Sequence, residues 1–196
     1  KAMLHCMKHM TDRANRGLVL APTRSWDGSN NFKFRVSGNS DSDYAKEPVD
    51  RRSVSGSVVR LEGSPVIFRS STQKHVALSV TEAELYAAVS TAQDMLYCMN
   101  VLLSLGLSVE LPMVLEVDNM GAVHLANNWS VSGRTRHIDV RQCFLREMKE
   151  KNLIVVKWIP GTKNVADLFT KNLSGPQFEE FAKVFVKEDE YTPEPE

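Results

Sequence analysis

A long helical pattern that follows three strand-like segments is the feature that most limits how this chain can fold. From Thr81 to about Leu105, apolar residues recur three or four positions apart, and Gly106 ends the pattern. A pattern of this length predicts one long helix with an apolar face against a core. Because strand-like segments stand on both sides of it in the sequence, we expect the helix to pack on a sheet.

The segments around this helix predict five strands. FKFRVSGNSDSDY (32–44) alternates apolar and polar residues, and SVSGSVVRLEG and SPVIFRSS follow as two short β-rich runs split at Glu62-Gly63. They predict an antiparallel meander. After the helix, PMVLEVDN and LIVVKWIP predict two further strands, and 121–128, 138–152 and the segments up to 186 predict helices. The expected order, β-β-β-α-β-α-α-β-α, is that of an α/β protein with a mixed sheet flanked by helices.

Composition favours one globular domain. The chain has 196 residues, of which 42% are hydrophobic and 24% charged. No apolar run approaches the roughly 20 residues of a membrane span, and the first residues lack the order of a signal peptide. The three cysteines form no CxxC pair, which favours reduced thiols in an intracellular setting.

Charge is balanced over the whole chain but not along it. The formal net charge is zero, so composition does not indicate nucleic-acid binding. Residues 51–75 hold five bases against one acid, whereas 188–196 hold five acids and no base. The acidic end therefore masks a locally basic surface, for which the alternative explanation is an ordinary solvated face.

Acidic residues stand where the expected strands and helices meet. They are Asp41, Glu84, Asp118 and Asp167. In open α/β sheets, ligands gather beyond the carboxyl ends of the strands, so acids at such junctions are candidates for a site. The local sequence leaves open whether Asp41 or Asp43 is the chemical residue. Glu82 and Glu84, two apart on a helix, project about 200° apart and cannot both serve one site.

Six ordered segments resemble the ribonuclease H domain of copia-like LTR-retrotransposon polyproteins. These are SGNSDSDYA, RRSVSG, VALSVTEAELYAA, LEVDNMGAVHLA, RTRHIDVR and ADLFTKNL, and the match spans roughly 17–181. The resemblance implies the ribonuclease H fold, with a five-stranded mixed sheet. It also implies a domain division: 1–31 as the end of the polymerase or connection region with a linker, 32–186 as the ribonuclease H domain, and 187–196 as an acidic, disordered tail.

The resemblance also assigns the site. It makes Asp41, Glu84, Asp118 and Asp167 the catalytic and metal-binding acids. Glu84 is chosen because the Glu-Leu-x-Ala pattern of related ribonucleases H falls on 84–87, and Asp43 becomes a structural acid. Four carboxylates suit two Mg²⁺ ions, for which Mn²⁺ can substitute, and such a pair supports phosphodiester hydrolysis. The expected reaction is cleavage of the RNA strand of RNA–DNA hybrids.

Basic and polar residues near these acids are candidates for substrate contact. Asn119 either caps the following helix or reaches a ribose 2′-hydroxyl. We expect Trp158 to lie in the core. The residues that could hold the phosphates or bases of the hybrid are Arg51, Arg52, Lys74, Asn119, Arg134, Arg136 and His137.

Two other functions stay open from the sequence. One is a catalytically inactive binding or scaffold module on the same fold, which the presence of all four acids disfavours. The other is a nuclease of this fold that acts on DNA. The resemblance further implies a reverse transcriptase polymerase region as partner, no membrane, and a cytoplasmic location inside virus-like particles.

Overall fold

The computed structural model describes residues 2–12, 16–29, 31–128 and 136–188. Its centre is a five-stranded sheet in the order β5-β4-β3-β7-β8. The first three strands in sequence, β3 (Val36–Asp43), β4 (Val54–Leu61) and β5 (Ser64–Thr72), form the expected antiparallel meander. The other two, β7 (Met113–Val117) and β8 (Ile154–Trp158), run parallel to β3. The expected mixed sheet is confirmed.

The long helix α2 (Val80–Ser104) begins at a well-formed cap. The hydroxyl of Ser79 accepts a hydrogen bond from the Glu82 amide at 3.1 Å, and the Glu82 carboxylate accepts one from the Leu78 amide at 2.7 Å. The helix ends before Gly106, whose φ of 76° suits glycine. One face of α2 packs on the sheet through Leu85, Met95 and other fully buried residues.

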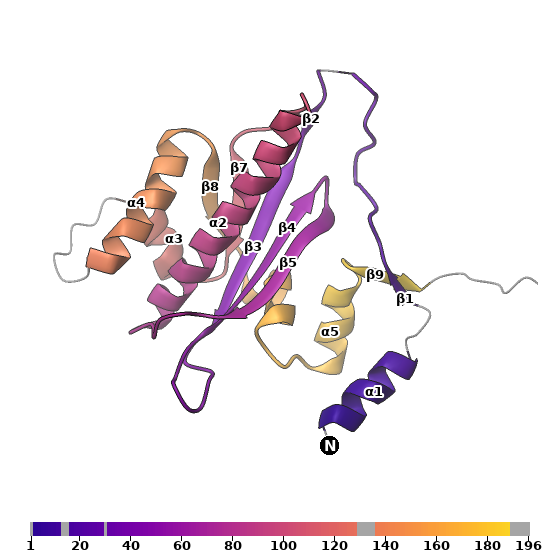
Figure 1. The fold of residues 1–196 in the computed structure, drawn as a ribbon, viewed down its shortest axis with the longest axis vertical. Helices are drawn as coiled ribbons and strands as arrows, with labels where there is room; N and C mark the ends of the chain where they lie inside the picture. The colour runs from indigo at the N-terminus through magenta and orange to yellow at the C-terminus, as the bar shows by residue number, and fades with distance from the viewer. Residues whose placement is uncertain (1, 13–15, 30, 129–135, 189–196) are drawn as a thin grey trace, which may run out of the picture.

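Two apolar layers lie on opposite sides of the sheet. On one side, α2, α3 (Met120–Asn127) and α4 (Arg136–Glu150) cover the main core, as Figure 1 shows. On the other side, a smaller cluster forms around Val58 and Phe181 beneath the short 3₁₀ helix η2 (Val165–Phe169) and α5 (Gly175–Ala182). The segment expected as a helix over 164–172 thus contains only the short 3₁₀ helix η2, and a second 3₁₀ turn, η1 (Gly161–Lys163), precedes it.

A short strand near the start of the chain and one near the end of the described residues form a small second sheet. β1 (Arg16–Leu18) pairs antiparallel with β9 (Val186–Glu188), next to α5 in Figure 1. The helix expected up to 186 therefore ends at Ala182, residues 183–185 form a turn, and Val186 begins β9. The helix α1 (Ala2–Asp12) precedes β1, and a third short sheet joins β2 (Lys33–Phe34) to β6 (Ser108–Val109). Most of the predicted tail, 189–196, lies outside the described residues.

Candidate active site

Three carboxylates meet at one end of the sheet. Asp41 lies near the end of β3, Asp118 follows the last residue of β7, and Glu84 is on the first turns of α2. Because β3 and β7 are parallel, with Ser40 opposite Val117, their ends bring the two aspartates together. One carboxylate oxygen from each of the three residues lies within 4.8 Å of the others, and Asp41 and Glu84 are buried.

The fourth acid joins this group through a lysine. Asp167 lies on η2, and the ammonium of Lys171 is 2.8 Å from Asp167 Oδ1 and 2.9 Å from Asp41 Oδ1. The hydroxyl of Thr170 also donates to Asp41 Oδ2. The structure therefore brings all four predicted acids to one site, three in direct proximity and Asp167 across the Lys171 bridge.

Hydrogen bonds hold the Glu84 carboxylate and the backbone that carries the other acids. The Ser42 amide donates to Glu84 Oε1 at 3.2 Å, and the indole N–H of Trp158 donates to the Asp118 carbonyl at 3.0 Å. Asn164, fully buried, donates to the Ser40 carbonyl at 2.9 Å and accepts from the Ala166 amide, so it ties η2 to β3. Both ends of the site are thus fixed by groups that do not belong to the carboxylate set.

Burial and mutual repulsion make ionisation of the acids costly. Burial raises the pKa of Glu84 to about 8, and the charges of Asp41 and Asp118 add to the rise. Burial, against the pull of Lys171, raises the pKa of Asp167 to about 6, and burial also raises the pKa of Asp118. Burial lowers the pKa of Lys171, but its hydrogen bonds to Asp167 and Asp41 outweigh this, and the net shift is upward. The site holds more negative charge than Lys171 neutralises.

Divalent cations fit this donor set. All its ligand atoms are carboxylate oxygens, which hard cations such as Mg²⁺ prefer. Among the described residues, Glu84 Oε2 is buried and has no hydrogen-bond donor. A buried acceptor without a donor is expensive unless something positive binds there. The residues that could hold ions are Asp41, Glu84, Asp118 and Asp167.

The alternative acids have other partners. Asp43 forms an ion pair with Lys46 at 2.7 Å, and Glu82 caps the start of α2 through the Leu78 amide. Neither belongs to the group of three clustered carboxylates. Both observations agree with the assignment of Asp41 and Glu84 rather than their neighbours.

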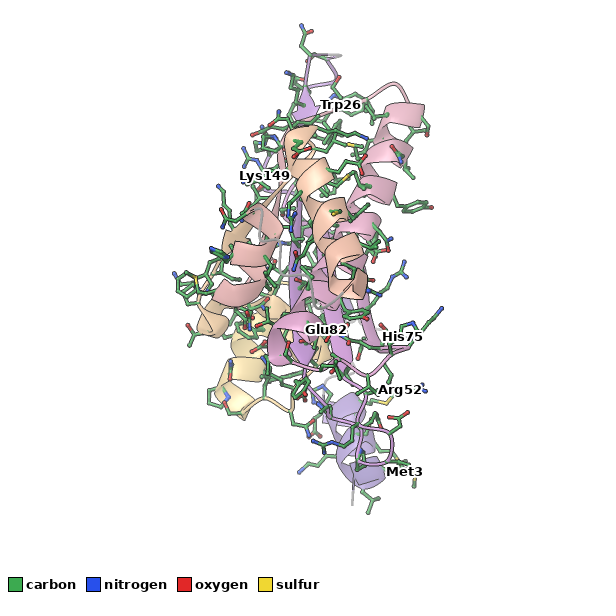
Figure 2. All side chains as sticks on the ribbon, turned by 90° about the vertical axis from the view of Figure 1, so that its left-hand side faces the viewer. Met3, Trp26, Arg52, His75, Glu82 and Lys149 are labelled. Carbon is green, nitrogen blue, oxygen red and sulfur yellow. The ribbon has the colours of Figure 1, made fainter. Side chains whose placement is uncertain are left out.

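The predicted substrate residues occupy different positions. Arg51, Arg52 and Lys74 are exposed on loops, and Arg52 pairs with Asp50 at 3.0 Å. In Figure 2, Arg52 and His75 lie toward the same end of the molecule as Glu82, the end at which α2 begins. Asn119 caps α3 by accepting from the Ala122 amide at 2.9 Å, so the capping alternative is confirmed.

Three of the predicted substrate residues lie at or just before the start of α4. Arg134 lies outside the described residues, and Arg136 and His137 lie in the first turn of α4 with side chains that are not described. Their predicted contacts with substrate stay predictions.

The expectation for Trp158 was wrong. Trp158 is the last residue of β8, an edge strand, and its side chain is 48% exposed beside Asp118. The apolar run of β8 did not distinguish its buried residues, Ile154 and Val156, from the exposed residues at its end, Lys157 and Trp158. The other residues that the sequence analysis did not assign are Asn164, Thr170 and Lys171. A signal for Lys171 was present, since Asp167 and Lys171 are an i,i+4 pair of opposite charge.

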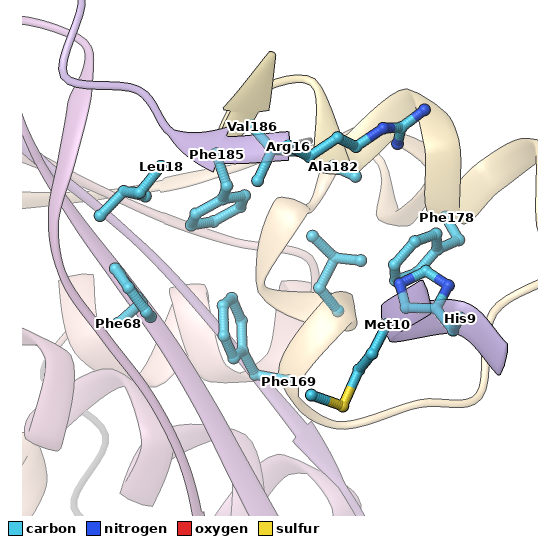
Figure 3. Close-up of a pocket in the computed structure, with 11 residues that line it drawn as sticks. His9, Met10, Arg16, Leu18, Phe68, Phe169, Phe178, Ala182, Phe185 and Val186 are labelled. Atoms are coloured by element: carbon cyan, nitrogen blue, oxygen red, sulfur yellow. The ribbon is translucent and has the colours of Figure 1, made fainter. Parts of the chain in front are cut away.

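An apolar cavity lies elsewhere in the fold. It has a volume of about 590 Å³ and lies between α1, the β1–β9 pair and α5. Figure 3 shows Phe68, Phe169, Phe178 and Phe185 around it, with His9 and Arg16 at its edge. Apart from those two residues its walls are apolar, and none of the clustered carboxylates lines it.

The sequence relatives of the chain are much longer proteins, and the chain matches one segment of each. It is 35% identical over 144 residues to the retrovirus-related Pol polyprotein from transposon TNT 1-94 of Nicotiana tabacum, which covers 74% of this chain and 11% of that protein. It is 28% identical over 182 residues to the corresponding polyprotein from transposon RE1 of Arabidopsis thaliana, covering 93% of this chain and 12% of that protein. The chain thus spans about a tenth of the length of these relatives. No protein-family model matches it.

Solved structures identify the fold. A ribonuclease H1 isolated from compost by a metagenomic approach, LC11-RNase H1, has a TM-score of 0.53 at 16% identity over 69% of this chain and 92% of that one. The same enzyme in complex with an RNA/DNA hybrid has a TM-score of 0.50 at 14% identity over 66% of this chain and 88% of that one. The chain is a ribonuclease H-fold protein. More particularly, it is homologous to a segment of plant retrotransposon Pol polyproteins, and the resemblance to the ribonuclease H domain of copia-like elements is confirmed. No helix among the described residues is long and apolar enough to cross a membrane.

Proposed function

We propose that this chain is a ribonuclease H domain that hydrolyses the RNA strand of RNA–DNA hybrids during retrotransposon reverse transcription. The observation that carries the proposal is the convergence of Asp41, Glu84 and Asp118, from three separate elements, on a space of 4.8 Å. A surface cluster of acids would relieve its repulsion by moving apart, but Asp41 and Glu84 are buried and fixed. Such an arrangement is stable when it has a cationic ligand.

In this proposal the four acids hold two Mg²⁺ ions, or Mn²⁺ in their place. When bound, a pair of such ions supplies the charge that activates an attacking water and stabilises the leaving oxygen of a phosphodiester. The chain's own residues set the geometry. Thr170 and the Ser42 amide orient the carboxylates of Asp41 and Glu84, and Trp158 fixes the backbone at Asp118. The acids must be ionised to bind cations, which the raised pKa values of Glu84 and Asp167 oppose in the free protein.

The choice of substrate rests on the relatives and on the fold. The polyproteins are retrovirus-related, and a solved structure of the same fold contains an RNA/DNA hybrid. The exposed residues Arg51, Arg52 and Lys74 are available for backbone phosphates. The proposal extends to a polymerase region of the same polyprotein as partner and to virus-like particles in the cytoplasm as location.

The test is cleavage of a labelled RNA–DNA hybrid by the wild type and by Asp118→Asn. The substitution keeps the side chain's size but removes one anionic ligand. The loss of several kcal/mol of transition-state stabilisation, at about 1.4 kcal/mol per decade, predicts at least about a hundredfold slower cleavage. Binding of the hybrid should persist, because phosphate contacts come from other residues.

The matched control is Glu82→Gln. Its amide oxygen can still accept from the Leu78 amide, and Glu82 is outside the clustered carboxylates. This variant should keep most of the wild-type rate. Equal rates for Asp118→Asn and the wild type would refute the metal assignment. Binding without any cleavage by the wild type in Mg²⁺ or Mn²⁺ would favour the inactive scaffold, and equal cleavage of duplex DNA would favour the DNA nuclease.

A further inference from the structure

A second, polar cavity borders the carboxylate site. It has a volume of about 380 Å³ and lies between the loop after β3, the β5 edge strand and the end of η2. Two of its lining residues, Thr170 and Lys171, are those that contact Asp41. The cavity is therefore adjacent to the carboxylate group, to which Thr170 and Lys171 connect it.

Groups that bind phosphate line this cavity. Lys46 and Lys171 contribute ammonium groups, and Ser70 and Thr72, two apart on β5, bring hydroxyls from one face of the strand, while Glu47 adds one acid to the lining. Lysine and hydroxyl donors are typical of contacts to a nucleic-acid backbone. The cavity differs from the larger apolar one in having several polar donors and few apolar side chains.

The walls of the cavity are held in place from both sides. The Ser70 hydroxyl donates to the Phe169 carbonyl at 2.5 Å, and the Lys46 ammonium donates to the Thr170 carbonyl while pairing with Asp43 at 2.7 Å. These bonds connect β5 and the β3–β4 loop to η2. A preorganised pocket loses less freedom when a ligand binds than one formed by mobile side chains.

We propose that this cavity binds a backbone phosphate of the substrate that flanks the phosphate being cleaved, with Lys46 as its principal cation. The proposal rests on the proposed function, because it needs a nucleic acid across Asp41 and Asp118. Because Thr170 and Lys171 both line the cavity and contact Asp41, a strand that places one phosphate at the carboxylates has its next phosphates near this cavity. Lys46 and the β5 hydroxyls thereby become positioning residues, which fix the register of the strand without reading its sequence.

The experiment measures hybrid binding by fluorescence anisotropy in chelator, so that cleavage does not interfere, over a series of salt concentrations. Thr72→Asp places a negative charge at the cavity wall and should weaken binding by about tenfold or more, since like charges face each other. Asn100→Asp makes the same charge change at an exposed position near the other end of α2 and should bind as the wild type does.

Lys46 is tested by its salt dependence. Lys46→Gln should lower the slope of log affinity against log salt by nearly one unit, the loss of about one phosphate contact, and Lys46→Arg should restore it. Melting temperatures of all variants identify any that fail to fold. Binding by Thr72→Asp equal to that of Asn100→Asp, or an unchanged slope for Lys46→Gln, would overturn the inference.

The outcome is separable from that of the proposed function. Cleavage of the hybrid by the wild type, measured in parallel with Mg²⁺, tests the function alone. A wild type that cleaves while Thr72→Asp and Lys46→Gln bind normally overturns only the phosphate site. A wild type that never cleaves overturns the activity, and weakened binding by both variants then still supports the phosphate site.

Discussion

Lys171 partly neutralises the charge of the clustered acids in the metal-free protein. Its ammonium lies within 3 Å of oxygens from both Asp41 and Asp167, at 2.9 and 2.8 Å, although the two acids come from opposite ends of the chain. A cation in this position offsets part of the repulsion that Glu84 and Asp118 add. The same oxygens are those proposed to hold metal ions, so the ammonium and a divalent cation compete for them.

This competition predicts the behaviour of Lys171→Met. In chelator at pH 8, the variant should lose stability, because buried carboxylates lose their counter-charge. The Lys171 side chain is 37% exposed, so we expect about 1–3 kcal/mol, between an exposed and a buried ion pair, or a few degrees in melting temperature. Added Mg²⁺ should raise the melting temperature of the variant more than that of the wild type.

Lys183→Met is the control for the loss of a lysine. Lys183 pairs with Glu180 at 3.1 Å on the surface, and both side chains are at least 70% exposed. Differential scanning fluorimetry with and without Mg²⁺ measures both effects. Identical melting temperatures for the two variants in chelator would show that Lys171 does not support the carboxylates.

Among the elements, the position of η2 against the sheet depends on Gly56, which has no side chain. Gly56 on β4 is opposite Asp41 in the sheet. A Cβ atom at Gly56 would lie 2.7 Å from the Ala166 carbonyl oxygen and 2.8 Å from Thr170 Cγ2. Glycine at this position lets η2 come close enough to the sheet to bring Asp167 and Thr170 to Asp41.

Gly56→Ala should therefore displace η2. The new Cβ would meet both the Ala166 backbone and the Thr170 side chain, so we expect the protein to lose about 1–3 kcal/mol of stability through overpacking. Hybrid cleavage should also be slower, although the catalytic residues themselves are unchanged. Thermal melting and a cleavage assay measure the two effects. Gly175→Ala is the matched control, because no atom lies within 4 Å of a Cβ there and its backbone is not left-handed. Wild-type stability and rate in Gly56→Ala would contradict this account of η2.

Local periodicity explains which elements could be predicted. The meander and α2 follow from patterns that repeat within a few residues, and the site at the ends of β3 and β7 follows from the order of strands. The β1–β9 pair was missed because its partners, Leu18 and Val186, are far apart in sequence, and although 16–22 reads as a short strand, no local pattern indicates what it pairs with. The choice of Asp41 and Glu84 needed the family resemblance, since Asp43 and Glu82 have the same local patterns.

Contacts across the fold explain what could not be predicted at the site. That Lys171 reaches Asp41 depends on how η2 packs on β3, which no local pattern encodes. Trp158 ends a strand with an apolar run, and the local pattern does not show that the buried part of β8 stops at Val156, so that Lys157 and Trp158 are exposed. The motif ADLFTKNL contains the residues of this part of the site, but their geometry comes from tertiary structure.

At the scale of the whole molecule, the local concentration of charge, and not the formal net charge, determines how stability depends on pH. The chain is neutral overall, yet Asp41, Glu84, Asp118 and Asp167 concentrate negative charge in one partly buried place. Folding brings these acids together, whereas unfolding releases them into water. The stability of the metal-free protein must therefore depend on pH through this site.

The direction of this dependence follows from the raised pKa values. Glu84 has an ordinary pKa of 4.5 when unfolded and about 8 when folded, and Asp167 rises from 3.8 to about 6. Between the ordinary and the raised values, the folded state binds protons that the unfolded state has released. The free energy of unfolding in chelator should then fall as pH rises from 5.5 to 8. Lys171, with its pKa raised from 10.5, stays protonated in both states over this range and does not oppose the trend.

Urea denaturation in chelator at pH 5.5 and pH 8 measures the effect, with Glu84→Gln as the control. The glutamine cannot ionise, so the variant should lose much less stability between the two pH values than the wild type loses. Mg²⁺ should reverse the trend for the wild type, because cations bind the ionised carboxylates and stabilise the folded state more as protons leave. A metal-free wild type that is as stable at pH 8 as at pH 5.5 would mean that Glu84 is not buried beside Asp41 and Asp118, and would contradict the buried carboxylate cluster on which the metal assignment depends.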